Sequence, residues 1–405
     1  MSNGAATAPL RTALAATLPE RPFTVEFWDG TALPATNGSG GLAFRLVSPV
    51  SLGHMLRAPG QLGLGRAYVT GGVEVEDIDA ALSLLDGWHP PPIDTRGRLR
   101  LAAAAVRAGA LRALPRAPVA ELRPSGRRHS YARDRRAVRH HYDVSNEFFS
   151  LFLDESMTYS CAIFSRGART LEEAQETKLE LVCIKLALSP GDRVLDVGCG
   201  WGSFAIHAAR EHDVHVTGIT LSEPQAALAR ERAAAAGVAD RVEFRVADYR
   251  DPLEREGFDA VASIGMVEHV GSANIDSYAR RLAAALKPGG RLLNHGIARL
   301  RHGDPEAGAF SERFVFPDAA PLHLSRIQAG LERAGFETQH IEGFGADYAV
   351  TLNHWLDRLE SRADEGMRLA GAERMRVWRV YLRASRRGFE QRFMSIYQVL
   401  AQLPG

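Results

Sequence analysis

The chain has little cysteine, little lysine and no long hydrophobic run. Its 405 residues include three cysteines, Cys161, Cys183 and Cys199, which have no regular spacing and form no C-x-x-C pair. This excludes a disulfide framework and agrees with a reducing compartment such as the cytoplasm. No apolar run approaches the roughly 20 residues of a membrane-spanning helix. We therefore expect a protein that is soluble or bound peripherally to a membrane.

The net charge is only +1, but the charge is unevenly distributed. Residues 96–139, here called the arginine-rich segment, hold thirteen arginines against two acids, Glu121 and Asp134. Its apolar patches favour contact with an anionic bilayer, and a solvated linker is an equally good interpretation. Nucleic acid is a weaker one, because aromatic residues for base stacking are not interleaved with the arginines.

The length and a hydrophobic content of 45% predict two domains. Residues 1 to about 90 mix strand-like and helical stretches, and the prolines at 90–92 end them. Residues 1–125 are therefore expected to form a small α+β domain with the arginine-rich connector, serving lipid, membrane or dimer contacts. Residues 126–405 are expected to form a larger α/β domain.

The most informative motif is the run L-D-V-G-C-G-W-G at residues 195–202. It predicts a buried strand, a glycine-rich turn that lets the backbone approach a ligand closely, and then a helix. A phosphate-binding P-loop would end in Gly-Lys-Ser/Thr, and a dinucleotide-binding turn would read G-x-G-x-x-G. The chain has neither pattern here. The motif resembles the first motif of S-adenosylmethionine methyltransferases.

Strand patterns alternate with helical ones from about residue 180 to 350. Strands are expected at 193–197, 214–220, 242–250 and 258–265, and the run 286–293 is expected to end a helix, turn and start a fifth strand. This alternation predicts a doubly wound, mostly parallel sheet that binds its ligand at the carboxyl ends of the strands.

Further motifs resemble the cyclopropane fatty acid synthase family. They are H-Y-D-x-S-N (141–146), M-x-Y-S-C (157–161), Q-x-x-K (175–178), T-L-S-x-x-Q (220–225), E-H-V-G (268–271) and a late tyrosine, Tyr348. All occur in order over about residues 140–400, and residues 62–69 also resemble the amino-terminal domain of longer bacterial members. The resemblance implies a class I S-adenosylmethionine methyltransferase fold (Rossmann-like) with helical lid insertions.

The implied activity is methyl transfer from S-adenosylmethionine to the double bond of an unsaturated acyl chain on a membrane phospholipid. The resulting carbocation loses a proton to a bound bicarbonate and closes a cyclopropane ring. A turn that often reads F-P-G-G-x-L-P in the family reads F-P-D-A-A-P-L here, at 316–322. That departure resembles the actinobacterial branch that makes 10-methylene fatty acids, so a methylene product is the alternative. A methyltransferase of small polar acceptors is a weaker alternative.

The resemblance also assigns site residues, to be compared with the structure below. The catalytic, bicarbonate-binding set is Cys161, Glu268, His295, Ile297 and Tyr348, with Glu268 expected to orient His295. The cofactor set is Tyr159, Ser160, Asp196, Gly198, Gly200, Gly202, Thr220, Gln225, Asp248 and Tyr249. No metal is expected, since His140, His141 and His269 lack a fixed ligand spacing.

Partners and location follow from the same resemblance. We expect unsaturated phospholipid acyl chains and an anionic membrane surface as partners, no nucleic acid, and a homodimer. The expected location is cytoplasmic, peripherally on the inner face of the membrane.

Overall fold

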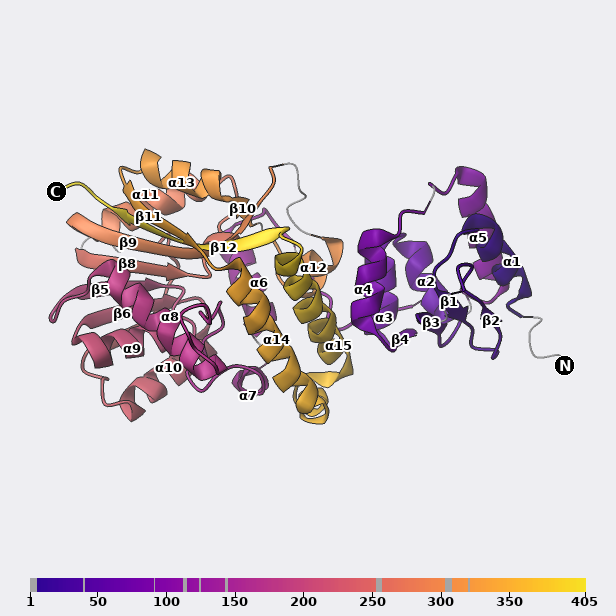
Figure 1. Ribbon diagram of the computed structural model, residues 1–405, viewed down its shortest axis with the longest axis horizontal. Coiled ribbons are helices and arrows are strands. Elements are labelled where there is room, and N and C mark those ends of the chain that lie inside the picture. The colour runs from indigo at the N-terminus through magenta and orange to yellow at the C-terminus, as the bar shows by residue number, and fades with distance from the viewer. Residues whose placement is uncertain are drawn as a thin grey trace. The chain divides into compact units, whose positions relative to one another are not determined.

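A computed structural model describes residues 6–38, 41–90, 92–111, 115–123, 125–142, 145–252, 257–302, 308–319 and 321–405, without the side chains of 139–142 (Figure 1). Of the H-Y-D-x-S-N motif, Asp143 and Val144 therefore lie outside the described residues. The chain divides into two compact units. One comprises Met1–Glu121 with Gly371–Arg383, and the other comprises Leu122–Ala370 with Ala384–Gly405.

The first unit is a small α+β structure built on a four-stranded sheet of order β2-β1-β3-β4. Its strands are β1 (Thr24–Glu26), β2 (Ala32–Leu33), β3 (Ala43–Leu46) and β4 (Val73–Val75). Its helices are α1 (Ala8–Thr17), α2 (Val50–Arg57), α3 (Gln61–Val69), α4 (Ile78–Gly87) and α5 (Thr95–Arg107). Phe23, Val25 and Phe27 of the sheet region join Leu10 and Ala13 of α1 in one core.

Part of a carboxyl-terminal helix also belongs to this first unit. Helix α15 (Ala363–Glu390) is interrupted at Gly371, whose φ of 80° and ψ of 160° are not helical. Beyond this break, Glu373 accepts a hydrogen bond from the backbone N–H of Ala120 (3.0 Å), and Arg383 pairs with Asp79 (3.2 Å). The sequence did not predict this return of the chain.

The second unit is a doubly wound α/β structure, which confirms the expected fold class. Its sheet has the order β11-β12-β9-β8-β5-β6-β7, with β10 beside β9. Strands β5, β6, β7, β8 and β9 pair in parallel, whereas β12 pairs antiparallel with β9 and β11. The strands are β5 (Arg193–Val197), β6 (His215–Thr220), β7 (Val242–Val246), β8 (Phe258–Ile264), β9 (Leu286–Arg299), β10 (Leu322–His323), β11 (Glu337–Gly343) and β12 (Met394–Gln402).

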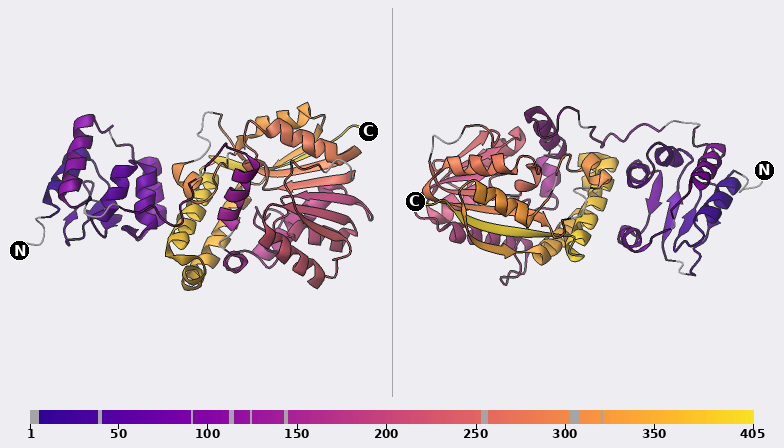
Figure 2. Two further views of the ribbon diagram at one scale, coloured as in Figure 1. Left: turned by 180° about the vertical axis from the view of Figure 1, so that it is seen from behind. Right: turned by 90° about the horizontal axis from the view of Figure 1, so that it is seen from above.

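Helices cover both faces of this sheet (Figure 2). On one face the core joins α8 (Leu171–Leu186), α9 (Ser203–His212) and α10 (Glu223–Ala235), and on the other it joins α11 (Ile275–Ala285) and α13 (Leu324–Arg333). Helix α8 starts at a capping box, in which Thr170 and Glu173 satisfy each other's backbone N–H groups. The central strands bury nearly every residue, as expected for parallel strands covered on both sides.

Five further elements belong to this unit. They are α6 (Tyr131–Tyr142), α7 (Asn146–Ser150), a 3-10 turn η1 (Val267–His269), α12 (Ala309–Phe314) and α14 (Gly345–Ser361). Of these, α6 and the region of η1 lie at the carboxyl ends of the parallel strands. No helix of the described residues is both long and apolar enough to span a bilayer.

Candidate active site

A hollow at the carboxyl ends of β5, β6, β7 and β8 is the candidate cofactor site. It includes six of the ten predicted cofactor residues, namely Gly198, Gly200, Thr220, Gln225, Asp248 and Tyr249. These residues come from three consecutive strand ends, so the hollow lies where a doubly wound sheet binds its ligand.

The glycine-rich turn approaches the hollow with a left-handed backbone. Gly198 has a φ of 79° and Gly200 a φ of 53°, and no atom lies within 4 Å of a Cβ built on Gly200. Gly202 differs, because its Cβ would lie 2.5 Å from the ring of Phe244. The structure therefore gives Gly202 a packing role under α9 and places it outside the residues that line the hollow.

The ends of β6 and β7 supply polar groups to the same hollow. Thr220 donates a hydrogen bond from its hydroxyl to the side-chain oxygen of Gln225 (2.8 Å), which fixes both on one wall. On the opposite side the carboxylate of Asp248 accepts two hydrogen bonds from Arg250, from Nε (2.7 Å) and Nη2 (2.5 Å). Arg250 also lines the hollow, although the sequence did not assign it to the site.

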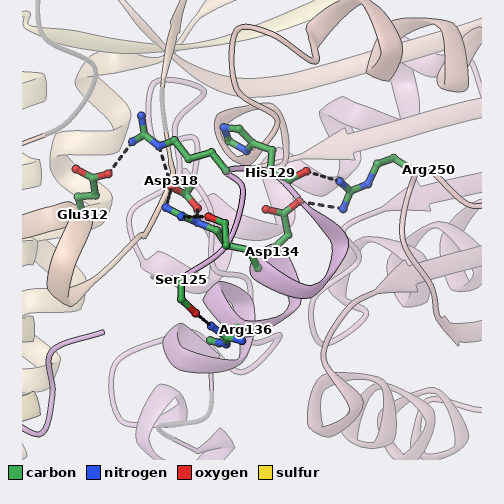
Figure 3. Close-up of polar contacts among 10 residues, drawn as sticks. Ser125, His129, Asp134, Arg136, Arg250, Glu312 and Asp318 are labelled. Carbon is green, nitrogen blue, oxygen red and sulfur yellow. Dashed lines mark hydrogen bonds and ion pairs between the residues drawn. The ribbon is translucent and has the colours of Figure 1, made fainter. Parts of the chain in front are cut away.

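Helix α6 of the arginine-rich segment closes the hollow from outside, together with residues Phe316, Pro317 and Asp318. Figure 3 shows the contacts that hold them. Asp318 is 4% exposed and pairs with Arg133 (2.5 Å) and Arg128 (3.0 Å). On the same helix, Asp134 pairs with Arg250 (2.9 Å). We call the pairing of Asp318 with Arg128 and Arg133 the clasp.

Asp318 stands where the family often has glycine. Its φ of 65° is the left-handed conformation that glycine adopts without strain and that aspartate tolerates better than most residues. The two arginines hold the pKa of Asp318 below its usual range, although burial of the carboxyl opposes them. Asp318 thus adopts the backbone conformation that glycine favours in the F-P-G-G turn, and it also forms an ion pair with Arg133 of α6.

His269 lines the same hollow and lies against the ring of Phe316, with 5.5 Å between the ring centroids. Burial, with the nearby His129, lowers the pKa of His269 to about 4. Its imidazole is therefore neutral at physiological pH.

The remaining predicted residues also belong to the second unit but are not among the residues that line this hollow. Tyr159, Ser160 and Cys161 belong to a loop held by α8. Gln175 donates to the carbonyl oxygens of Thr158 (3.1 Å) and Ser160 (2.9 Å). The backbone beyond them is held by α14, where Thr351 accepts from the N–H of Ala162 (3.0 Å).

Lys178 links several of these residues although it was predicted only as part of a motif. Its ammonium is 1% exposed, donates to the hydroxyl of Ser160 (3.0 Å), and interacts electrostatically with Cys161, Asp196 and His295. Burial lowers the pKa of Lys178 to about 8, although nearby acidic groups including Asp154 oppose that shift.

Three aromatic rings, those of Tyr159, Trp355 and Tyr348, lie together in this unit. The ring of Trp355 on α14 lies 5.1 Å from that of Tyr159 and 6.1 Å from that of Tyr348, measured between centroids. Tyr348 also lies 4.6 Å from Phe389. Tyr159 and Tyr348 are thus brought to one indole, and Cys161 contacts the carbonyl oxygen of Phe344 (3.7 Å), which precedes the same helix.

The buried acid and histidine have unsatisfied polar atoms. Glu268 accepts a hydrogen bond at Oε1 from the backbone N–H of Ile297 (2.6 Å), while its Oε2 has no partner. Neither ring nitrogen of His295 has one, so the expected contact between Glu268 and His295 is absent between these two described side chains. Burial raises the pKa of Glu268 to about 7 and, with the charges of Lys178 and Lys185, lowers that of His295 well below its usual value.

Comparisons with known proteins identify the family. The model described as "Mycolic acid cyclopropane synthetase" matches residues 129–399. The chain belongs to this family. It is 38% identical to the "Probable fatty acid methyltransferase" of Pseudomonas putida over 95% of this chain and 92% of that protein. It is 33% identical to the "Cyclopropane-fatty-acyl-phospholipid synthase" of Escherichia coli K12, over 90% and 89% of the two chains.

A solved structure supports the same assignment. The mycolic acid cyclopropane synthase CmaA1, solved with SAH and CTAB, matches with a TM-score of 0.63 and 31% identity, over 66% of this chain and 98% of that one. The family member described here is therefore an S-adenosylmethionine-dependent methyltransferase of the cyclopropane synthase type. The residues that line the hollow are compatible with such a cofactor, because they combine an open glycine turn with polar groups from the next two strand ends.

The clasp should contribute to cofactor affinity. Replacing Asp318 with Asn leaves Arg128 and Arg133 without their buried carboxylate, and we expect the dissociation constant for S-adenosylmethionine to rise about fivefold to thirtyfold, or about 1–2 kcal/mol. Isothermal titration calorimetry measures this. Arg136→Gln is the matched control, since Arg136 is exposed on the same helix and bonds only Ser125 among the described contacts. Equal affinities in the two variants would contradict the role of the clasp.

We expect the buried carboxylate of Glu268 to lower the free energy of unfolding at neutral and alkaline pH. Its folded pKa of about 7 exceeds its ordinary value of 4.5, so the destabilisation is absent below pH 4.5 and complete above pH 7. We expect Glu268→Gln to raise the free energy of unfolding by about 1–2 kcal/mol at pH 8 and to abolish product formation. Denaturant unfolding at pH 8 and pH 5, in buffer free of bicarbonate, measures the first effect. A variant destabilised equally at both pH values would refute this account.

Proposed function

We propose that this enzyme transfers a methyl group from S-adenosylmethionine to the double bond of an unsaturated acyl chain of a membrane phospholipid and forms a cyclopropane ring. The observation that carries the proposal is the buried region beyond the cofactor hollow. There the rings of Tyr159, Trp355 and Tyr348 pack against one another, and the buried side chains of Glu268 and His295 have polar atoms without partners. Such a region suits an apolar substrate with a reactive centre, and suits a water-soluble acceptor poorly.

An alkene is a weak nucleophile, so the enzyme must align it with the activated methyl group and exclude water. The rings of Tyr159, Trp355 and Tyr348 offer π-faces that stabilise a cation on the acyl chain. Burial raises the pKa of the Cys161 thiol well above its ordinary value, so the thiol stays protonated and does not attack that cation. S-adenosylmethionine supplies the electrophilic methyl group.

The residues present fit a small oxyanion such as bicarbonate, which would accept the proton lost from the cation. The imidazole of His295 is buried, neither of its nitrogens has a partner, and its N–H can donate a hydrogen bond to an anion. The hydroxyl of Tyr348 is the proposed second donor. Glu268 offers its free Oε2 to the hydroxyl of that ion. The backbone N–H of Ile297 is engaged by Glu268, so we propose that Ile297 acts through the position of Glu268 rather than by binding the ion itself.

A methylene product is the alternative, and it rests on the resemblance of the turn at 316–322 to the 10-methylene branch. The departure at Asp318 resembled the 10-methylene branch, but this residue lines the cofactor hollow and bonds α6. This position does not distinguish the two products, so the methylene chain stays the alternative. We keep the cyclopropane as the proposed product.

A product assay tests the proposal. Purified enzyme, labelled S-adenosylmethionine and vesicles of oleoyl phospholipid should give label in a cyclopropane acyl chain, identified by mass spectrometry of the released fatty acids. Removing bicarbonate should slow the reaction. Label confined to water-soluble acceptors would overturn the proposed substrate, and a methylene chain would replace the proposed product by the alternative. Glu268→Ala and His295→Ala should yield no product while still binding the cofactor, and near-normal turnover would refute their roles.

We further propose that α5 is the part of the arginine-rich segment that contacts an anionic membrane. Leu99 is 66% exposed and Val106 is 43% exposed, and their spacing of seven residues places both on the same face of α5. Arg96, Arg100 and Arg107 are exposed beside them. An exposed apolar stripe flanked by arginines suits the interface of an anionic bilayer. By contrast, Arg128 and Arg133 already pair with Asp318.

Vesicle co-sedimentation tests this docking. Binding should require anionic lipid and weaken as salt rises. The triple change Arg96→Gln, Arg100→Gln and Arg107→Gln should reduce the apparent affinity by about a hundredfold, at roughly 1 kcal/mol per arginine. Arg326→Gln, a substitution on α13, is the control. Salt-insensitive binding to neutral vesicles would contradict the proposal. A homodimer, implied by resemblance alone, is testable by analytical ultracentrifugation.

A further inference from the structure

Four potential metal ligands lie together between α8 and α9, apart from the hollow and from the buried aromatic region. They are Glu180, Cys183, His207 and His212, and their ligand atoms all lie within 4.8 Å of one another. Cys183 and His207 are buried, and Glu180 and His212 are partly exposed. None of them is used in the proposed reaction.

The side chains converge on one point. Oε2 of Glu180 lies 3.2 Å from Nε2 of His207 and 3.0 Å from Nε2 of His212. Glu180 and Cys183 are three residues apart on α8, so their side chains lie on the same face of that helix. Two helices thus present one carboxylate, one thiol and two imidazoles to a common centre.

This donor set matches the preferences of zinc. Zinc in proteins takes four ligands in a tetrahedron from cysteine, histidine and carboxylate, at about 2.0–2.3 Å. Ligand atoms around such an ion are separated by about 3.3–3.8 Å, and all four ligand atoms here lie within 4.8 Å of one another, so binding requires only small side-chain movements.

A surface depression gives access to the cluster. Glu180 and His207 line it together with Glu173, Glu176 and Glu211, and Arg166 is the only cation among its described lining residues. The excess of carboxylates favours the approach of a divalent cation.

We propose that this cluster binds one Zn²⁺ ion as a structural link between α8 and α9. The sequence predicted no metal, so this proposal departs from that prediction, and the proposed ion takes no part in the reaction. Helix α8 carries Gln175 and Lys178, which hold the loop at 158–161, and α9 follows the glycine-rich turn. A link between these two helices would stabilise the supports of both halves of the site.

Titration of the metal-depleted full chain with Zn²⁺ tests the proposal. Calorimetry should give one equivalent per chain, and the melting temperature should rise on saturation. Co²⁺ in the same site should show a thiolate charge-transfer band that Cys183→Ser removes. Glu180→Gln and His212→Gln should each weaken Zn²⁺ binding by at least about tenfold, whereas His215→Gln, at an exposed position on β6, should not.

The outcomes are distinguishable from failure of the proposed reaction, because each readout is metal binding and not turnover. If Cys183→Ser does not fold, the two partly exposed variants decide the result. Absence of saturable binding, or equal binding by the variants and the His215→Gln control, would overturn the proposal. The four side chains would then be a hydrogen-bonded packing cluster.

Discussion

The structure depends on holding charge in a region from which water is excluded. Lys178 is the central example, since its ammonium is buried at the junction of the loop at 158–161, the end of β5 and β9. An isolated buried ammonium is strongly destabilising, and here Asp154, Asp196 and the hydroxyl of Ser160 compensate it. The same burial raises the pKa of Asp196 to about 7 against the attraction of Lys178. Removal of Lys178 would therefore leave an acid without its counter-charge as well as a loop without its anchor.

A second set of charges surrounds the cofactor hollow and lies closer to solvent. Arg250 connects Asp248 at the end of β7 to Asp134 on α6, and its guanidinium lies 4.0 Å from the ring centroid of Tyr131. The clasp adds the turn at Asp318 to the same helix. Ion pairs thus hold α6 against the cofactor hollow. The aromatic rings, by contrast, lie together around Trp355. This division matches a polar nucleoside cofactor on one side and an apolar acceptor on the other.

The sequence predicted the features that depend on local pattern and on parallel topology. Gly198, Gly200, Thr220, Gln225, Asp248 and Tyr249 meet because parallel strands end at one edge of the sheet. Features that depend on side-chain partners distant in sequence were not predictable. Gly202 resembled a ligand glycine, yet Phe244 occupies the space beside it. Asp318 and Arg133 are 185 residues apart in sequence, and no local pattern pairs them. A lysine in a polar helix is normally solvated, so the burial of Lys178 also had no local signal.

The unpartnered polar atoms of Glu268 and His295 are informative because a fold gains nothing from them. Leaving a buried donor or acceptor unsatisfied costs about 1–3 kcal/mol, and a hydrophobic or amide side chain of similar volume would avoid much of that cost. Both residues lie in well-packed positions, with Glu268 anchored through Ile297 and His295 within the β9 ladder beside Gln398. Their orientation is therefore imposed by the surrounding structure and is not an accident of loose packing. A buried acid and imidazole held in place without partners agree with the proposed oxyanion, which would complete their hydrogen bonds.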